Sequence, residues 1–391
     1  MIAKAMQPSI TPAPSQPTLA NWRTAPFNRW AFRHVREIVP SARIARGPLT
    51  AWRLERDIRP LEALAFQAPD GRSLSIAEMA AETFTDGLIV LKHGRILHES
   101  YHAGHDAETP HIVFSVSKSV TALLAGVLVG QGRLDPDAPV THYVPEAKAS
   151  AYRAATVRHV LDMTVGVAFE ENYLAPDPTF LRYREATNWN PPTGEPCDLN
   201  SFLSTLPPDG SPHGEAFHYV SPNSDMLGWI IERAGGRRYA DLATDLLWRP
   251  MRPEADAYVT VDRLGAARAA GGVCMTLRDI ARIGEMVRCR GMAGGRQVVP
   301  GEWIDDIAAN GDPEAWAKGS MKGLIPGGRY RSKWYVTKGG VLMAIGIHGQ
   351  WIYVDRAAGI VIAKQSSQPE PADDPADALT VRAFKALARE A

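Results

Sequence analysis

Runs of apolar residues predict β-strands near both ends of the chain. The first two are joined by a tight turn at His93-Gly94, and a turn at residues 355–359 separates the last two. The expected strands are residues 88–91, 95–101, 340–346, 350–354 and 359–365. A sheet built from these strands must be assembled from both halves of the chain.

Helical periodicity is strongest in residues 115–130. Its apolar positions recur at helical spacing, and Gly130 and Gly132 end it. Another helix should begin after Thr276, a good N-cap, and one at residues 221–233 has Pro222 in its first turn and a Gly-Gly pair after it. The remaining expected helices are residues 30–39 and 375–388.

These elements predict an α+β protein. A mainly helical domain should be inserted into the sheet domain, because residues 135–251 show helices and Pro-rich loops with little strand alternation. The expected parts are an extended N-terminal arm at 1–27, a sheet domain at 28–115 and 252–391, and the inserted domain at 116–251.

The amino-acid composition limits the kinds of partner that this protein can bind. The 391 residues are 45% hydrophobic, which is enough to bury one large core or two modest ones. Basic and acidic residues number 43 each, so no long-range field attracts nucleic acid or an anionic membrane. No stretch alternates basic with aromatic residues. We therefore expect no nucleic-acid partner.

Hydropathy and cysteine usage indicate a cytoplasmic protein without a membrane partner. Residues 1–20 hold no apolar run of secretory or membrane type, and the most hydrophobic stretch, 113–129, is interrupted by serines and a lysine. The three cysteines, Cys197, Cys274 and Cys289, are odd in number and lack C-x-x-C spacing, which is typical of reduced thiols. A secreted enzyme without disulfides is the alternative.

The strongest chemical motif is Ser115-Val116-Ser117-Lys118 at the start of the long helix. A spacing of three places Ser115 and Lys118 on one helix face. A lysine removed from water has a lowered pKa and can take the serine proton. The N–H of Ser115 at the helix start could stabilise an oxyanion. An isolated S-x-x-K is more often an ordinary surface pair, so the motif needs context.

That context lies about a hundred residues further on, where Tyr219 precedes a helix that contains Leu227-Gly228-Trp229-Ile230-Ile231-Glu232. The combination resembles the serine β-lactamase and penicillin-binding-protein superfamily, in its class C and esterase-like branch. Within that branch it is most similar to the 6-aminohexanoate-dimer hydrolases, which act on nylon oligomers. The similarity spans roughly residues 28–367, through matching text at residues 28–32, 39–42, 115–119, 271–273 and 346–350.

The resemblance implies a β-lactamase/transpeptidase-like fold, with an antiparallel sheet flanked by helices and an inserted, mainly helical domain. It also implies catalytic roles. Ser115 would be the acylated nucleophile, Lys118 its general base, and Tyr219 the phenol that protonates the leaving group. The N–H of Ile347, after the third-motif strand, would be the second oxyanion donor. The alternative for Tyr219 is a packed aromatic beside a helix.

Two positions depart from the wider superfamily pattern. Ser221 stands where Y-x-N has Asn, as it also does in the nylon-oligomer branch. The third motif is Ala344-Ile345-Gly346, without the cationic residue that helps to hold a β-lactam carboxylate. Simple amides and esters are therefore expected as substrates ahead of penicillins.

Substrate contacts are implied at several further positions. Tyr173 and Trp189 match loop residues that close over the substrate, although loop aromatics also cover cores. Arg184 stands where efficient nylon enzymes carry an acidic residue for the substrate ammonium, and Glu185 is adjacent. The other substrate-binding candidates are Ser221, Ala270, Tyr335 and His348.

The segment from His98 to His102 fits the zinc-protease motif H-E-x-x-H. That motif needs both histidines on one helix face, whereas here it falls in an expected strand. In a strand the two residues would lie about 13 Å apart, too far for one zinc ion. A polar sheet-edge segment is the favoured interpretation. His213 and His218 are likewise expected to be loop residues.

The sequence therefore predicts a serine hydrolase that forms an acyl-enzyme with linear amides or short-chain carboxylic esters. No metal or organic cofactor is implied, and a homodimer is among the assemblies left open. The alternatives are a β-lactamase or D-Ala-D-Ala carboxypeptidase, a zinc peptidase that uses His98 and His102, and a non-catalytic binding protein.

Overall fold

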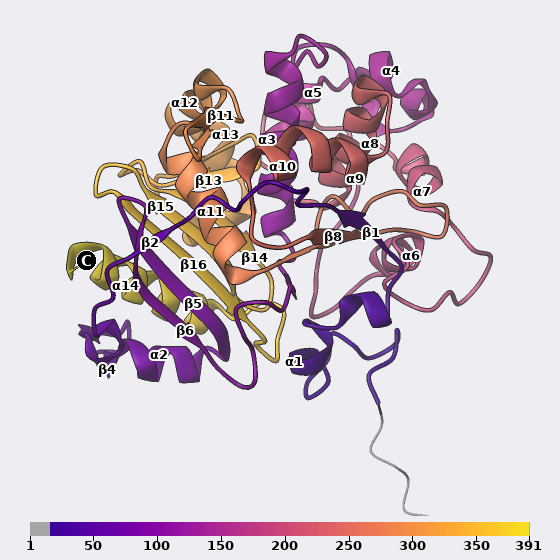
Figure 1. Cartoon of the computed structure of the whole chain (residues 1–391). Helices are drawn as coiled ribbons and strands as arrows, with labels where there is room; N and C mark the ends of the chain where they lie inside the picture. Colours follow the sequence, from indigo (N-terminus) through magenta and orange to yellow (C-terminus); the bar gives the residue numbers. More distant parts are fainter. Residues whose placement is uncertain (1–15, 391) are drawn as a thin grey trace, which may run out of the picture.

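The computed structural model describes residues 16–390 and contains a large sheet, a smaller sheet and a helical region (Figure 1). The large sheet has eight strands in the order β12-β13-β14-β15-β16-β5-β6-β2. Their bounds are β2 (Glu55–Arg56), β5 (Thr85–Lys92), β6 (Arg95–Tyr101), β12 (Arg329–Arg331), β13 (Trp334–Val336), β14 (Leu342–Gly346), β15 (Gln350–Asp355) and β16 (Ile360–Ser366).

Strands from the two ends of the chain meet where β16 pairs with β5, which confirms that the sheet is assembled from both halves. Neighbouring strands are antiparallel except at one edge, where β2 runs parallel to β6. The expected antiparallel arrangement holds for every pair except β2 with β6, because β2 reaches β6 through a crossover connection and not through a hairpin.

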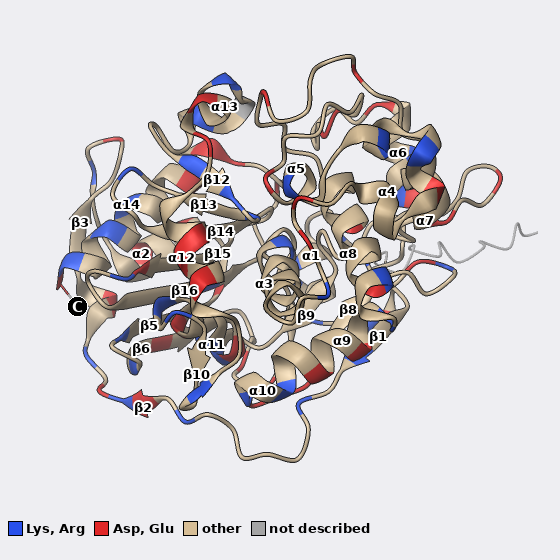
Figure 2. Cartoon of the chain, turned by 90° about the horizontal axis from the view of Figure 1, so that it is seen from above, with Lys and Arg blue, Asp and Glu red and all other residues tan. Residues whose placement is uncertain are grey.

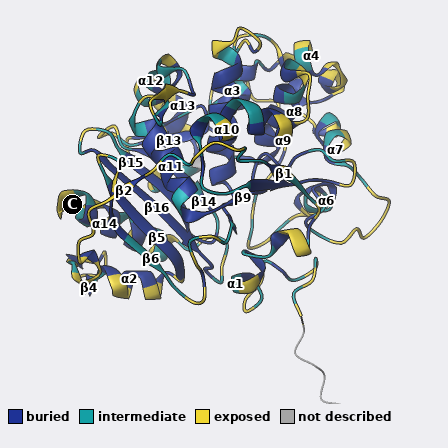
Figure 3. Cartoon of the chain, in the orientation of Figure 1, coloured by how far each residue is buried: buried dark blue, intermediate teal, exposed yellow. Residues whose placement is uncertain are grey.

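Both faces of the large sheet are covered. Leu88 and Val90 of β5 join a cluster under the C-terminal helix α14 (Asp374–Glu390), which also contains Phe384. Ile89 and Leu91 join the core on the side of α11 (Leu277–Arg288). Successive side chains of a strand point to opposite faces, so burial on both faces explains the continuous apolar run in β5. Figure 3 shows these central strands as buried.

The smaller sheet was not predicted from the sequence. Its order is β1-β8-β9-β7, with bounds β1 (Ser41–Ile44), β7 (His111–Ile112), β8 (Ala257–Thr260) and β9 (Val273–Met275). These strands have only two to four residues, too few for a clear alternation. The sheet positions the chemistry, because β7 leads into Ser115 and the N–H of Val113 donates to the carbonyl of Val273.

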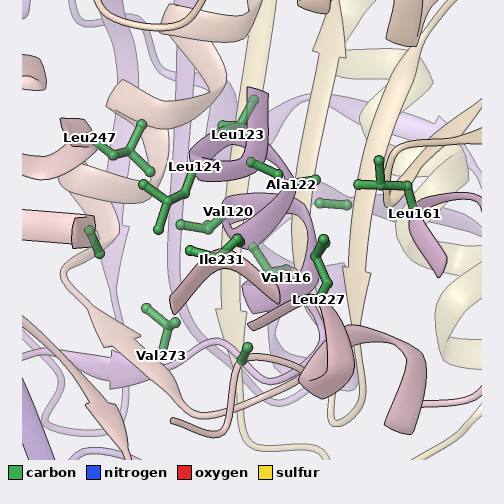
Figure 4. Close-up of a cluster of buried hydrophobic side chains, with 14 of the residues drawn as sticks. Val116, Val120, Ala122, Leu123, Leu124, Leu161, Leu227, Ile231, Leu247 and Val273 are labelled. Carbon is green, nitrogen blue, oxygen red and sulfur yellow. The ribbon is translucent and has the colours of Figure 1, made fainter. Parts of the chain in front are cut away.

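Helix α3 (Val116–Gly130) forms the centre of the helical region, and residues 116–128 are all buried. Figure 4 shows Val116, Val120, Leu123 and Leu124 of α3 with Leu227 and Ile231 of the following helix α8 in one apolar cluster. The surrounding helices are α4 (Val140–Tyr143), α5 (Val157–Leu161), α6 (Pro178–Ala186), α7 (Leu199–Thr205), α8 (Pro222–Gly235), α9 (Tyr239–Leu242) and α10 (Arg249–Met251).

The predicted helix at 30–39 is shorter than expected. It consists of α1 (Asn28–Ala31) and one 3₁₀ turn at Val35–Glu37. The expected arm also needs correction: the structure describes residues 16–27 of it, and they form mainly turns, with Trp22 completely buried. Trp22 packs against Phe32, Phe114 and Trp189, and these contacts between distant segments hold it in place. Residues 1–15 lie outside the described part.

The other predicted helices are present. The Thr276 hydroxyl caps α11 by accepting from the N–H of Asp279 at 3.3 Å, as expected for an N-cap. The remaining elements are α2 (Ile76–Glu82), α12 (Gly301–Ala309), α13 (Pro313–Lys318), β3 (Ala65–Gln67), β4 (Ser73–Ser75), β10 (Met292–Ala293) and β11 (Arg296–Gln297). The boundaries 115/116 and 251/252 between the sheet and helical parts stay predictions.

Charges of both signs alternate over the molecule in the view of Figure 2. Within residues 16–390, no helix combines the length and apolar character that crossing a bilayer requires.

Candidate active site

Ser115 lies directly before α3, at the point where the chain leaves the smaller sheet. The preceding residue, Phe114, has a φ of +41°, which is unusual for a bulky side chain and costs about 1–3 kcal/mol. Phe114 is held there by Phe32, at 4.8 Å between ring centroids, and by Trp22 and Trp189. This packing stabilises the sharp turn that presents the Ser115 side chain to a cavity.

Lys118 is one turn further along α3, and its side chain is buried. Its Nζ donates to Ser115 Oγ at 2.7 Å and to the carbonyl of Ala270 at 2.8 Å. Burial lowers the pKa of Lys118 to about 8, and Arg268 acts in the same direction, against Glu171 and Asp225. A substantial neutral fraction of this amine therefore exists near pH 8, next to the serine hydroxyl.

Tyr219 comes from the segment before α8 and reaches the same place. The Nζ of Lys118 is 5.0 Å from the centroid of the Tyr219 ring. Burial, followed by the nearby carboxylate of Glu171, raises the pKa of Tyr219, while the hydroxyls of Ser115 and Tyr335 act in the opposite direction. The phenol is therefore protonated at neutral pH, as a proton donor must be.

The end of β14 closes the site from the other side. A Cβ added to Gly346 would lie 3.0 Å from the Ser115 nitrogen, so only glycine allows β14 to approach so closely. Ile347 follows and lines the cavity. The backbone N–H groups of Ser115 and Ile347 have no acceptor within residues 16–390. Two backbone donors without an acceptor, next to the Ser115 hydroxyl, are an arrangement suited to stabilising an oxyanion.

These side chains surround a cavity of about 720 Å³, large enough for a small organic substrate. Tyr173 and Tyr335 line it together with Ser115 and Tyr219. The Tyr335 ring stacks on the Tyr219 ring at 6.5 Å between centroids. Its outer wall comes from α14, which contributes Asp374, Asp377, Ala378, Val381, Arg382 and Lys385.

A family profile for Beta-lactamase matches residues 75–386. The chain belongs to the beta-lactamase family. Its sequence is 39% identical over 363 residues to the 6-aminohexanoate-dimer hydrolase of Paenarthrobacter ureafaciens, covering 92% of this chain and 90% of the relative. The predicted resemblance to a family of serine hydrolases is therefore confirmed.

Solved structures agree on the fold. A structure named "Putative 6-aminohexanoate-dimer hydrolase from Bacillus anthracis" superposes with a TM-score of 0.86 at 23% identity and covers 95% of this chain and 96% of that one. A family VIII carboxylesterase superposes with a TM-score of 0.59 at 14% identity, over 80% of this chain and 96% of the esterase. The predicted beta-lactamase and transpeptidase-like fold is confirmed.

Glu171 also lines the cavity of this beta-lactamase-family protein, and sequence reasoning missed it. It accepts hydrogen bonds from the Ser221 N–H, from the Ser221 hydroxyl at 2.7 Å, and from the Tyr173 hydroxyl. Glu171 thereby joins the loop of Tyr173 to the start of α8. It lies in a loop without periodicity, so only its proximity to Tyr173 could have drawn attention to it.

A buried hydrogen-bond network holds the backbone of Ala270, whose carbonyl accepts from Lys118. Asp225 of α8 accepts from the N–H of Ala270 at 2.8 Å, and its other oxygen accepts from Tyr183 at 2.5 Å and from Arg268. The carboxylate thereby holds the backbone segment whose carbonyl binds Lys118. Among the substrate-binding candidates, Ala270 is thus buried and in contact with Lys118, while Ser221 contacts Glu171.

Three other candidates lie away from the cavity lining. Trp189 is buried and its indole N–H donates to the Thr260 hydroxyl at 3.1 Å. His348 is buried with Nδ1 at 2.7 Å from the Gln368 carbonyl, and burial lowers the pKa of His348 to about 3, so its ring is neutral. Arg184 is half-buried, with its guanidinium 4.3 Å from the Phe180 ring centroid and 5.9 Å from that of Tyr173.

Arg184 has no ion pair or side-chain hydrogen bond within residues 16–390. Burial, and then the neighbouring Arg268, lower its pKa, whereas Tyr173 and Glu171 raise it. The carboxylate of the adjacent Glu185 accepts a hydrogen bond from the Thr193 hydroxyl at 2.7 Å and forms an ion pair with Arg182 at 3.6 Å. In this structure the guanidinium of Arg184, and not the carboxylate of Glu185, lies next to the Tyr173 ring.

The H-E-x-x-H segment is part of β6 and not of a helix. Both histidines lean toward Ser100, with Nε2 atoms 3.0 Å and 3.2 Å from its hydroxyl, so the expected separation of about 13 Å was wrong for the rings. Glu99 is bound by Arg56, Arg278 and Tyr101. In the described part of the chain, no three His, Cys, Asp or Glu side chains are grouped as metal ligands. The polar sheet-edge interpretation accounts for this segment.

Proposed function

We propose that this protein hydrolyses linear amides of short amino acids, such as 6-aminohexanoate oligomers, or short-chain carboxylic esters, through an acyl-enzyme on Ser115. The observation that carries the proposal is the 2.7 Å hydrogen bond between Lys118 Nζ and Ser115 Oγ, made by a lysine whose pKa is lowered to about 8. A base within hydrogen-bond reach of the nucleophile, with a pKa near the working pH, is the requirement for activating a serine.

In the first step Ser115 Oγ attacks the substrate carbonyl carbon while its proton passes to neutral Lys118. The carbonyl oxygen becomes an oxyanion, which the N–H groups of Ser115 and Ile347 stabilise. Collapse of this intermediate breaks the bond to the amine or alcohol, which takes a proton through Tyr219. Lys118 then restores the proton to the phenol.

In the second step water attacks the ester carbonyl carbon and loses one proton to neutral Lys118, which later returns a proton to Ser115 Oγ. The second tetrahedral intermediate collapses, the carboxylic acid leaves, and Ser115 Oγ regains its proton. Water exclusion by Tyr173 and Tyr335, which line the cavity, would strengthen both electrostatic effects.

The third-motif strand supports amides and esters ahead of β-lactams. The first residue of the motif on this strand, Ala344, is buried and apolar, so it offers no charge to a β-lactam carboxylate. The relative from Paenarthrobacter ureafaciens is named 6-aminohexanoate-dimer hydrolase, and the units of a 6-aminohexanoate dimer are joined by an amide. We also place the protein in the cytoplasm, because Cys197, Cys274 and Cys289 are all free thiols. A homodimer is the assembly to test first.

The decisive experiment is intact-mass analysis after exposure to a fluorophosphonate. The wild type should gain one phosphonyl adduct, and Ser115→Ala should gain none. Hydrolysis of the 6-aminohexanoate linear dimer, p-nitrophenyl butyrate and nitrocefin should then be compared. Nitrocefin turnover above that of butyrate would favour a β-lactamase, and activity that survives in Ser115→Ala but is lost with a chelator would favour the zinc peptidase.

A further inference from the structure

A second hollow joins the catalytic cavity. It measures about 370 Å³ and shares Leu324, Ile345, Val381 and Lys385 with the larger cavity. Because four residues border both spaces, a molecule bound at Ser115 can extend from one into the other. We call the smaller space the side chamber.

The floor of the side chamber follows β14. Residues 341, 343 and 345 alternate along the chain and therefore face the same side of the sheet. On the neighbouring strand β15, Tyr353 pairs with Met343 and Trp351 pairs with Ile345, which extends the floor sideways. Two paired strands thus form the floor of the side chamber.

The opposite wall comes from two other parts of the chain. Val381 and Lys385, one helical turn apart on α14, face the groove, and residues 324–326 close its end. Met343, Trp351 and Tyr353 are buried, whereas Val341 and Val381 are partly exposed. The groove is thus open to a ligand and has an apolar interior.

The charged side chains that line the side chamber are all positive. Lys338 and Lys385 are its only ionisable cations, and no acidic residue among residues 16–390 lines it. Both lysines are exposed, and neither side chain has an ion pair or a hydrogen bond in the described part of the chain. Lys338 lies at the far end, in the turn between β13 and β14. An apolar groove that ends at a free cation is complementary to an apolar chain with an anionic end.

The length of the groove limits its ligand. From Ile345, beside the oxyanion donors, to Val341 is four residues of extended chain, or about 13 Å. An extended chain advances about 1.2 Å per bond, so the groove accommodates roughly ten bonds beyond the reacting carbonyl. A butyryl group would leave most of it empty.

We propose that the side chamber binds an extended, unbranched apolar arm of the substrate, and that Lys338 binds a carboxylate at the end of that arm. This inference rests on the proposed hydrolysis at Ser115, because it assigns a substrate class to the same site. It predicts that the enzyme prefers long unbranched chains to short ones, and so favours linear amides with an extended arm over short-chain esters among the proposed substrates.

The test compares p-nitrophenyl esters from butyrate to decanoate, and a matched series of n-alkyl butyrates in which the leaving group lengthens. In one of the two series, kcat/KM should rise by about tenfold or more with chain length, as burial of added methylene groups implies. Val341→Trp should abolish that rise by filling the far end of the groove. The control Leu264→Trp adds the same bulk at a residue that is 67% exposed and outside both cavities.

A second variant that fills the side chamber keeps the test valid if Val341→Trp does not fold. Gly339 lines the chamber, and a Cβ there would meet nothing nearer than the Thr337 hydroxyl at 3.8 Å, so Gly339→Trp should fold. It should flatten the chain-length profile as Val341→Trp does. A profile that is flat in both series for the wild type, or unchanged in both variants, would overturn the proposal.

The proposed binding of a terminal carboxylate by Lys338 is tested with two substrates. They are the decanoate ester and the analogue of that ester with a carboxylate at the far end of its chain. Lys338→Glu should reduce kcat/KM for the carboxylate by about tenfold relative to the uncharged chain. The matched control is Lys148→Glu, because Lys148 is also an exposed lysine but lines neither cavity. Equal effects of Lys338→Glu on both substrates would remove the lysine from the proposal.

The outcomes separate this inference from the proposed function. If Ser115 is labelled and butyrate is hydrolysed while chain length has no effect, only the side chamber assignment fails. If Ser115 is not labelled and no ester is hydrolysed, the proposed function itself fails.

Discussion

The hydroxyl of Ser221 donates to the carboxylate of Glu171 across 2.7 Å. This bond, together with the one from the Ser221 N–H, connects the loop that carries Tyr173 to the residue two positions after Tyr219. One carboxylate therefore orients two aromatic residues that line the cavity. It also raises the pKa of Lys118, so it affects both the shape and the protonation of the site.

We expect Glu171→Gln to move the pH profile of kcat/KM. Removing this carboxylate removes an influence that raises the pKa of Lys118, so the amine loses its proton at lower pH. The acid limb of the profile should shift toward lower pH. The control is Glu170→Gln, because Glu170 is adjacent and exposed. An identical limb in wild type and Glu171→Gln would show that Glu171 does not act on Lys118.

The pH dependence of the wild type follows from Lys118. The amine must be neutral to accept the Ser115 proton, and its pKa is lowered to about 8. Ester hydrolysis should therefore rise as pH increases through about 8 and then level off, because burial raises the pKa of Tyr219 above its usual range. Lys118→Arg, which keeps a permanent cation, should reduce kcat by about 10²–10⁴-fold. An arginine variant with wild-type kcat would contradict the role of Lys118 as the base.

Tyr219→Phe should reduce amide hydrolysis more than ester hydrolysis. An amine needs a proton in order to leave, whereas p-nitrophenolate leaves as an anion. We expect a loss of about 10²-fold or more in kcat for the 6-aminohexanoate dimer and a smaller loss for p-nitrophenyl butyrate. Tyr143→Phe, which removes a phenol hydroxyl outside the cavity lining, is the matched control. Equal losses on the two substrates would indicate that the phenol does not protonate the leaving group.

Arg184→Asp tests the unpaired cation behind Tyr173. A carboxylate there should raise kcat/KM for amides with a free ammonium group, by about tenfold relative to their N-acetylated forms, because like-charge repulsion becomes attraction. The control is Arg182→Asp on the same helix, where the arginine pairs with Glu185 at the surface. If the two variants change the ratio equally, Arg184 has no specific influence on the substrate charge.

Trp22→Ala should destabilise the protein through the aromatic cluster around Phe114. Trp22 is fully buried, so its truncation should lower the free energy of unfolding by about 3–5 kcal/mol, measured by denaturant titration. Trp30→Ala removes an indole that is 40% exposed and should cost far less. Because Phe114 holds the turn before Ser115, kcat should also fall in Trp22→Ala at temperatures where it is folded. Similar unfolding curves for the two variants would contradict this role.

Several features could be predicted from the sequence because they depend on neighbours in the chain. Ser115 and Lys118 are three residues apart in a helix, which places them on one face whatever surrounds them. The strands β5, β6, β15 and β16 and the cap at Thr276 follow from local patterns of apolar and turn residues. Tyr219 could be assigned only through the resemblance, since nothing local connects it to Lys118.

Other features were decided by the tertiary structure. Glu171, Asp225 and the wall formed by α14 act through contacts between segments that are far apart in sequence, and loop residues carry no periodic signal of such contacts. The burial of Trp22 likewise depends on Phe32, Phe114 and Trp189, which meet it only after folding. The sequence by itself thus determined that Ser115 and Lys118 share one face of a helix, because short-range geometry sets this, and its motifs in order indicated the class of fold. Packing between distant segments determined the charges around the site, the support of its strained turn and the shape of the space for a substrate.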